Sequence, residues 1–213
     1  MDKQEQLTQL KKEMQADKSL PLRNSATQLV FGEGSATAKI YFLGEAPGYW
    51  EDQKGRPFVG QAGQLLDEML ESIGILKKDV YSSSQEARRA SSAYISNIVR
   101  FRPPENRDPE PQEIAAFAPF IDKEIEIIDP KIIVTLGRFS MGKFFPYEKI
   151  SKVHGKPKEI TWHGKKIMVI PMYHPAAALR NSDIMVQIKE DFKKIPEILE
   201  KVSQEKITQQ SLF

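Results

Sequence analysis

The chain of 213 residues contains no cysteine, only three histidines and no long apolar run. The absence of cysteine excludes disulfides, thiol catalysis and iron–sulfur clusters bound by cysteine ligands. His154, His163 and His174 lack the close spacing that is typical of a zinc site, so we expect no metal. No apolar segment approaches the ~20 residues that a membrane-spanning helix requires, so we expect no membrane association.

Charge and composition further narrow the class of protein to which the chain could belong. The formal net charge of +2 is too small by itself to indicate nucleic-acid binding, so any DNA-binding surface must be local. The charged segment Met1–Gln6 is not followed by an apolar signal segment, which predicts a soluble cytoplasmic protein. Hydrophobic residues make up 40% of the chain, and the length suits one α/β domain with or without tails.

Short apolar runs alternate with helical patterns along the chain. Buried strands are predicted at residues 39–43, 93–99, 132–136 and 167–171. Helices are predicted at residues 3–16, 61–73, 110–128, 138–145 and 183–202. The strands are too apolar to have one solvent-exposed face, which favours a parallel sheet that is covered by helices on both sides. We therefore expect an α/β fold with three α/β/α layers around a central four-stranded parallel sheet.

Two polar segments interrupt this alternation. The segment 82–92 is rich in serine and arginine and leads into the second strand, so it lies opposite the ligand-binding edge of the sheet. We therefore do not expect Arg88 and Arg89 to contact a substrate. Residues 203–213 turn polar after the last helix and are predicted to form a flexible tail beyond a domain of residues 1–202.

Chemically useful side chains gather where the predicted strands end. Gly44-Glu45-Ala46-Pro47-Gly48 follows the first strand, Asn97 lies near the end of the second, and His174-Pro175-Ala176 follows the fourth. Ligand pockets of α/β proteins form at this edge. The Asn97 amide could both donate to and accept from a flat base, while Phe58 could stack on it. Each residue alone also fits a structural role, as a strand hydrogen-bonder, a cap or a core aromatic. Their shared edge favours a pocket.

These segments resemble the family 4 uracil-DNA glycosylases, and the resemblance extends from about residue 7 to residue 200. The matching segments are Val30–Gly34, Gly44–Gly48 with Glu51-Asp52, Gly55–Gly63, Asn97 with Arg102-Pro103-Pro104 and Asn106-Arg107, Val134–Arg138, and His174–Ala176. The resemblance implies a four-stranded parallel sheet between helices. It also implies a monofunctional enzyme of base excision repair that removes uracil from DNA and leaves an abasic site.

The same resemblance implies a role for each pocket residue. Gly44 and Ala46 would belong to the pocket wall, Phe58 would stack on uracil, and Asn97 would read its pairing edge. His174 would stabilise the negative charge that develops on O2.

Either of two glutamates could position the water molecule that attacks the sugar. Better-known uracil glycosylases carry a water-positioning aspartate where this chain has Ala46. Catalysis would therefore depend chiefly on stabilisation of the leaving group, for which one aligned donor contributes about 3–4 kcal/mol. Either Glu45 or Glu51 could position the water. Glu51 is also expected near the C5 edge of uracil, where it would crowd the methyl group of thymine.

The chain departs from the family at the cluster ligands. Family members usually hold a four-iron cluster on four cysteines. The corresponding positions here are Asp17, Leu20, Phe101 and Phe117. We therefore expect no cofactor, with the three apolar side chains forming a small hydrophobic cluster. Burial of each could contribute about 1.5–3 kcal/mol.

Contacts with DNA and with a protein partner are also implied. Arg102, Arg107 and Arg138 are expected to bind phosphates, while Leu179 and Arg180 would fill the gap left by a flipped base. The enzyme is expected to act as a monomer.

The C-terminal Gln209-Gln210-Ser211-Leu212-Phe213 resembles the pentapeptide that binds bacterial sliding clamps. In that case Gln209, Leu212 and Phe213 would make the contacts. The alternative is that the apolar end packs on its own domain.

Two other functions share the same features. The pocket could accept another deaminated base, such as hypoxanthine or xanthine. The protein could instead be a catalytically silent adaptor that binds DNA lesions.

Overall fold

The computed structural model describes residues 1–75 and 93–210, without the side chains of residues 205–210. The predicted polar segment with Arg88 and Arg89 lies outside the described residues, as do Leu212 and Phe213. Within these ranges, no helix has both the length and the apolar character needed to cross a membrane.

The centre of the molecule is a mixed six-stranded sheet with the order β1-β3-β2-β4-β6-β5. Its strands are β1 (Glu33–Gly34), β2 (Ile40–Gly44), β3 (Ala93–Asn97), β4 (Ile132–Leu136), β5 (Lys158–Trp162) and β6 (Lys165–Met172). The neighbouring pairs β3–β2, β2–β4 and β4–β6 are parallel, as predicted.

The prediction of a purely parallel four-stranded sheet was wrong at both edges. The strands β1 and β5 pair antiparallel with β3 and β6. Neither has the continuous apolar run of a fully buried strand, because β1 has two residues and β5 alternates between half-buried and exposed positions. Edge strands are commonly short or polar, so the search for apolar runs missed them.

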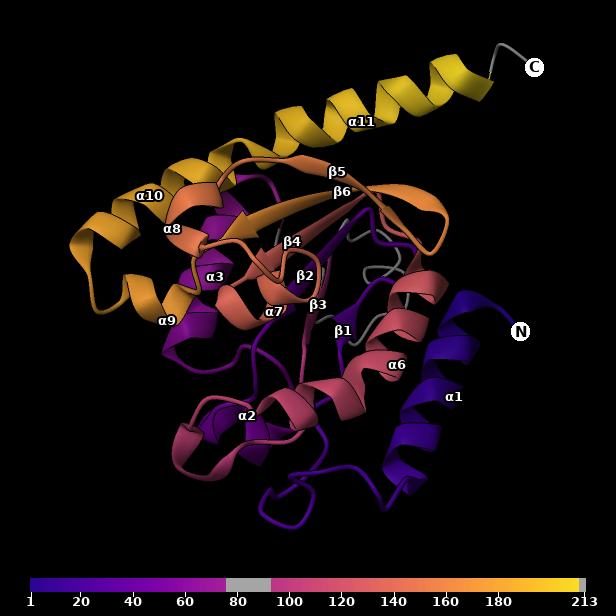
Figure 1. The fold of residues 1–213 in the computed structure, drawn as a ribbon, viewed down its shortest axis with the longest axis vertical. Coiled ribbons are helices and arrows are strands. Elements are labelled where there is room, and N and C mark those ends of the chain that lie inside the picture. Colours follow the sequence, from indigo (N-terminus) through magenta and orange to yellow (C-terminus); the bar gives the residue numbers. More distant parts are fainter. Residues whose placement is uncertain (76–92, 211–213) are drawn as a thin grey trace.

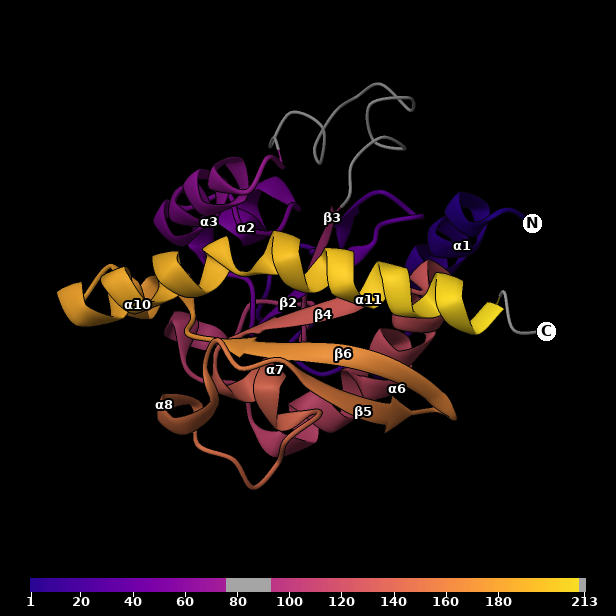
Figure 2. The ribbon, with the colours of Figure 1, turned by 90° about the horizontal axis from the view of Figure 1, so that it is seen from above.

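Helices cover both faces of the sheet (Figures 1 and 2). The helices are α1 (Lys3–Ala16), α2 (Tyr49–Lys54), α3 (Gln61–Ser72), η1 (Pro104–Asn106), α6 (Pro111–Ile128), α7 (Arg138–Gly142), α8 (Ile150–Val153), α9 (Pro175–Ala178), α10 (Ser182–Lys193) and α11 (Ile195–Gln210). On one face, α1 and α6 lie side by side and pack against Tyr41. On the other face, α3, α10 and the start of α11 pack against Phe42, whose ring stacks on Phe192.

The predicted helix 138–145 ends at Gly142, and the predicted last helix differs from the structure most. The predicted single helix 183–202 is divided between α10 and α11 at Lys194, because Pro196 lacks the N–H that a continuous helix would use. Helix α11 then continues to Gln210, so residues 203–210 of the predicted flexible tail are helical. Glutamine, glutamate and lysine are good helix formers, and polarity alone does not end a helix.

A buried polar cluster joins α6 to the sheet. The Glu124 carboxylate accepts hydrogen bonds from the hydroxyls of Tyr41 at 2.5 Å and Ser96 at 2.9 Å, and from Arg100 Nη2 at 2.5 Å. Both partners of the Arg100–Glu124 ion pair are completely buried. Removing one partner of such a pair typically costs about 3–5 kcal/mol, so the cluster fixes α6 against β2 and β3.

Candidate active site at the ends of the parallel strands

The pocket begins where three parallel strands end. Gly44, the last residue of β2, is paired in register with Asn97, the last residue of β3. His174 follows the end of β6 at Met172 and caps the short helix α9. The fold therefore brings together three residues that are far apart in sequence, as the sequence predicted.

Gly44 leaves room for the Asn97 amide and the Phe58 ring. A Cβ atom on Gly44 would lie 2.4 Å from Asn97 Oδ1 and 2.6 Å from Phe58 Cζ, which real side chains do not tolerate. The Phe58 ring stacks in turn on the His174 ring, with 5.8 Å between centroids and 28° between planes. Glycine is therefore required at position 44 for steric reasons, and Phe58, Asn97 and His174 meet around it.

The Asn97 amide carries an unused hydrogen-bonding atom. Asn97 is 2% exposed, and its Oδ1 atom has no hydrogen-bond partner among the described residues. An unpaired buried polar atom costs about 1–3 kcal/mol. A ligand with a complementary donor would recover that cost, so this atom is a candidate ligand contact.

The surroundings of His174 fix its protonation state. Its Nδ1 atom accepts a hydrogen bond from the backbone N–H of Ala176 at 3.1 Å, so in the neutral ring the proton lies on Nε2. Burial lowers the pKa of His174 from 6.5 to about 4. At neutral pH the side chain is therefore an uncharged imidazole with an N–H donor.

Glu45 borders a cavity of about 360 Å³ together with His174, Arg138 and Arg180. Burial raises the pKa of the Glu45 carboxyl from 4.5 to about 7, and nearby Asp108 acts in the same direction. The backbone N–H groups of Phe139 and Arg138 act in the opposite direction by hydrogen bonding to the carboxylate. A carboxyl with a pKa near neutrality can exchange a proton with water, as a general base must.

Glu51 is held by the backbone of the loops around it. Its Oε2 atom accepts from the N–H of Gly48 at 3.1 Å, and Oε1 accepts from those of Val59 and Gly60 at 2.7 Å each. Three of roughly four acceptor positions of the carboxylate are thereby used. Glu51 therefore positions the loop that carries Phe58, a function that the sequence analysis did not anticipate.

The backbone at Phe58 is held in an unusual conformation. Phe58 has a φ of +52°, and a Cβ atom on Gly63 would lie 1.9 Å from the Phe58 carbonyl oxygen. The first turns of α3 thus pack directly on the Phe58 backbone.

Ala46, which was predicted to line the pocket wall, is half-buried and packs against the core beneath α6 and α7.

The arginines predicted to bind phosphate differ in their surroundings. Arg102 lies with its Cζ atom 5.3 Å from the centre of the Tyr49 ring and donates to Asn106 Oδ1 at 2.8 Å. Arg138 pairs with Asp108 and borders the cavity of Glu45.

Arg107 makes two hydrogen bonds to Glu113, at 2.6 and 2.9 Å, near the start of α6. The guanidinium of Arg107 is therefore committed to a structural ion pair that anchors the loop before α6.

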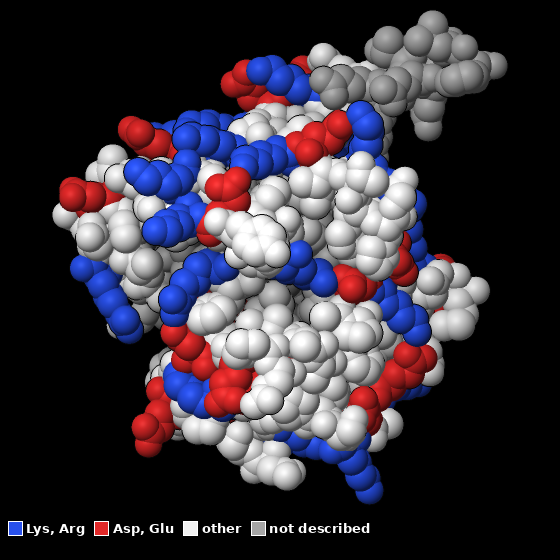
Figure 3. Space-filling model, in the orientation of Figure 1, with Lys and Arg blue, Asp and Glu red and all other residues white. Residues whose placement is uncertain are grey.

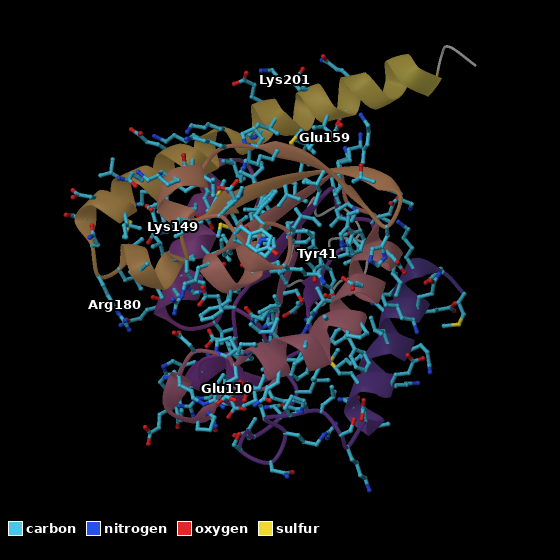
Figure 4. All side chains as sticks on the ribbon, viewed as in Figure 1. Tyr41, Glu110, Lys149, Glu159, Arg180 and Lys201 are labelled. Atoms are coloured by element: carbon cyan, nitrogen blue, oxygen red, sulfur yellow. The ribbon has the colours of Figure 1, made fainter. Side chains whose placement is uncertain are left out.

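Leu179 and Arg180, which were predicted to fill the gap left by a flipped base, are both exposed. Leu179 is 46% exposed, and Arg180 extends outward from the loop after α9 (Figure 4). On the same side of the molecule, basic side chains are interspersed with acidic ones rather than forming one positive field (Figure 3). The charge pattern of this face therefore does not by itself indicate an extended DNA-binding surface.

The predicted cluster positions do not fit an iron–sulfur group. Leu20, Phe101 and Phe117 are at most 5% exposed and belong to one hydrophobic cluster, with the two phenyl rings 6.1 Å apart. Asp17 instead accepts hydrogen bonds from the backbone and hydroxyl of Ser19. Among the side chains that the structure describes, those of residues 1–75 and 93–204, no three from histidine, aspartate or glutamate are arranged to hold a metal ion.

Two residues of the site were not predicted. Gly137 has a φ of +101°, and a Cβ atom there would lie 2.0 Å from Glu45 Oε1, so glycine makes room for the carboxylate. Asp108 borders the same cavity and pairs with Arg138. The position of Gly137 directly after an apolar strand could have identified it as a site residue. Nothing near Asp108 in the sequence indicated its role.

An amide, an aromatic ring and a neutral imidazole thus lie together where parallel strands of the sheet end, which is the usual place for a ligand site in an α/β protein. Residues 31–200 match the Uracil DNA glycosylase superfamily. The chain belongs to this superfamily.

Individual relatives cover nearly the whole chain. A type-4 uracil-DNA glycosylase from Sulfurisphaera tokodaii is 45% identical over 197 residues, which are 90% of this chain and 84% of the relative. Type-4 uracil-DNA glycosylases from Archaeoglobus fulgidus and Thermotoga maritima are 41% and 42% identical, over 91% and 85% of this chain and 94% and 88% of their own lengths.

Proposed function

We propose that this protein is a uracil-DNA glycosylase, which hydrolyses the N-glycosidic bond between uracil and deoxyribose and leaves an abasic site. The observation that carries the proposal is the unpaired, buried amide oxygen of Asn97 beside Phe58 and His174. A uracil base would offer its N3–H to this oxygen and its O4 to the amide N–H₂ group. The face of the base would lie on Phe58.

The neutral His174 supplies the main catalytic interaction. When the bond between C1′ and N1 breaks, its electron pair remains on uracil, and negative charge gathers partly on O2. The Nε2–H of His174 would donate a hydrogen bond to that oxygen. An aligned donor in a site shielded from water contributes about 3–4 kcal/mol to the transition state.

Glu45 is the better candidate of the two glutamates for handling water. Its carboxyl faces the cavity shared with His174, whereas most acceptor positions of Glu51 are used by backbone N–H groups. Water would attack C1′ from this cavity and give its proton to Glu45. Since the pKa of Glu45 is about 7, the carboxylate form becomes abundant as pH rises through neutrality.

The test is release of uracil from single- and double-stranded oligonucleotides, detected by alkaline strand scission. We expect His174→Ala and Asn97→Ala each to lower kcat/KM by roughly 10²–10³-fold, the usual effect of losing an aligned donor. His163→Ala and Asn24→Ala change exposed residues elsewhere and serve as matched controls. Full activity in both pocket variants would refute the proposed site.

A panel of lesions tests the base that is recognised. Oligonucleotides with uracil, hypoxanthine or xanthine are supplied in competition, and uracil should be released first because its edge matches the Asn97 amide. Preferential release of another base would reassign the substrate. Tight binding to all lesions without release would instead identify a silent adaptor.

The iron-free state belongs to the same proposal. Because the chain contains no cysteine and apolar side chains fill three of the four cluster positions, uracil release should not require iron. Treatment with an iron chelator should therefore leave the rate unchanged.

The C-terminal pentapeptide supports a second proposal, that the enzyme binds a bacterial sliding clamp through Gln209, Leu212 and Phe213. Gln209 lies in the last turn of α11, which would hold the peptide away from the pocket. A pull-down with purified clamp compares the whole chain with a chain that ends at Ser211. Equal recovery of both proteins would dismiss this partner.

A further inference from the structure

Two neighbouring aromatic side chains are exposed next to the pocket loop. Tyr49 is 49% exposed and Trp50 is 56% exposed, and both lie in the first turn of α2, directly after Gly48. Their rings meet edge to face, with centroids 5.1 Å apart. The roles assigned above to the pocket residues use neither ring.

The helix that carries the aromatic pair is anchored by two carboxylates, those of Asp52 and Glu51. The buried Asp52 carboxylate accepts from the backbone N–H of Thr27 at 2.8 Å. Glu51, next in the chain to Trp50, fixes Gly48 and the loop after Phe58 through its three hydrogen bonds. The rings are therefore exposed although their backbone is firmly anchored, which lowers the entropic cost of binding a ligand on them.

A cation completes this surface. The Arg102 guanidinium lies 5.3 Å from the centre of the Tyr49 ring, and its Nε atom is oriented by Asn106. The contact between Arg102 and Tyr49 joins α2 to the loop that leads into α6, and the two lie side by side (Figure 1). Trp50 lies against the other neighbouring loop, since a Cβ atom on Gly60 would be 3.6 Å from Trp50 Cδ1.

We propose that Tyr49, Trp50 and Arg102 form a stacking surface for an unpaired nucleotide next to the flipped uracil, so that the enzyme engages single-stranded DNA beyond the target base. This inference rests on the proposed function. Aromatic faces combined with a cation are the usual means of binding single strands without reading their sequence. The aromatic pair adjoins the loop that carries Phe58, because Glu51, next to Trp50 in the chain, accepts from the backbone N–H groups of Val59 and Gly60. A nucleotide next to a uracil stacked on Phe58 would therefore lie toward Tyr49 and Trp50.

The chain has two tryptophans, which provides a direct test. Trp162 pairs with Lys165 at the start of β6, and the pocket lies beyond the other end of that strand. Trp162→Phe leaves Trp50 as the only tryptophan, and Trp50→Phe leaves Trp162, so excitation selective for tryptophan reports on one site in each variant. A uracil-free single-stranded oligonucleotide should quench the emission of the Trp162→Phe protein and leave that of the Trp50→Phe protein unchanged. Equal quenching in both variants, or quenching as strong with a duplex, would overturn the proposal.

Affinity for the same uracil-free strand gives the second measurement. Trp50→Ala should weaken binding roughly tenfold, in line with the loss of one stacked base, while Trp50→Phe should restore most of it. Arg102→Ala should reduce the slope of log Kd against log salt concentration by roughly 0.7–1.

Unchanged affinity in Trp50→Ala would refute the stacking surface and leave the aromatic pair as a protein contact. Because the DNA contains no uracil, this result is independent of base release. Trp50-dependent binding by a protein that releases no uracil would therefore contradict only the proposed enzyme activity.

Discussion

At the scale of single residues, Glu45 and His174 border one cavity but have pKa values shifted in opposite directions. Burial favours the uncharged form of each, which means a protonated glutamic acid and a deprotonated imidazole. Each shift is equivalent to about 3 kcal/mol of stability across its pH range. The raised pKa of Glu45 contributes stability that is present below pH 4.5 and lost as pH rises to about 7. The lowered pKa of His174 contributes stability that is present above pH 6.5 and lost as pH falls to about 4.

These opposite contributions nearly cancel in the wild type between pH 4.5 and 6.5, so single variants should reveal them. Relative to the wild type, the unfolding free energy of Glu45→Gln should rise by up to about 3 kcal/mol from pH 4.5 to 7. That of His174→Gln should fall by a similar amount from pH 4 to 6.5. Denaturant unfolding at a series of pH values measures both differences. Three parallel curves would show that burial does not shift these groups.

At the scale of secondary-structure elements, Glu51 joins the start of α2 to the loop that carries Phe58. Glu51→Gln removes the negative charge and one of the two acceptor oxygens, so part of the set of N–H groups at Gly48, Val59 and Gly60 loses its partner. We expect a loss of about 1–3 kcal/mol in stability. We also expect kcat/KM to fall by roughly 10²-fold through displacement of Phe58.

Glu71→Gln on the exposed side of α3 is the matched control, with little expected change in either quantity. Thermal unfolding and uracil release are measured on the same preparations. If Glu51→Gln were as stable and active as this control, Glu51 could not be holding the Phe58 loop.

The elements that could be predicted from sequence are those with a strong local pattern. The four central strands are continuous apolar runs, and α1, α3 and α6 repeat apolar residues at helical spacing, so their positions followed from the sequence. The edge strand β5 was missed because a half-exposed strand has no such run. The role of Glu51 was missed because its partners are backbone N–H groups up to nine residues away, and backbone donors leave no trace in a sequence.

The convergence of the candidate site residues was more predictable than their surroundings for the same reason. Gly44, Asn97 and His174 follow strand ends, and a parallel sheet places all such ends at one edge. The pairing of Arg107 with Glu113, by contrast, depends on how the loop before α6 folds. A sequence identifies an arginine in such a loop without indicating whether it is already paired.

At the scale of the whole molecule, apolar packing occupies three of the four positions that were expected to correspond to the family's cluster ligands. Phe101 and Phe117 are buried between α1, α6 and the loop after β3, in one hydrophobic cluster with Leu20. The Arg23 guanidinium lies 5.1 Å from the centre of the Phe101 ring and donates to the carbonyl of Gln15 at the end of α1. This arrangement connects the N-terminal helix to the domain.

The global stability of the protein should therefore depend on this packing. Phe101→Ala would leave a cavity in the cluster and remove the face on which Arg23 lies, so we expect a loss of about 3–5 kcal/mol in unfolding free energy. Tyr147→Ala, at a position that is 97% exposed, should change the unfolding free energy by less than about 0.5 kcal/mol. Chemical denaturation of both variants gives the comparison. A small cost for Phe101→Ala would mean that α1 is held by its contacts with α6 alone, and that the aromatic pair does not replace the cluster as a structural link.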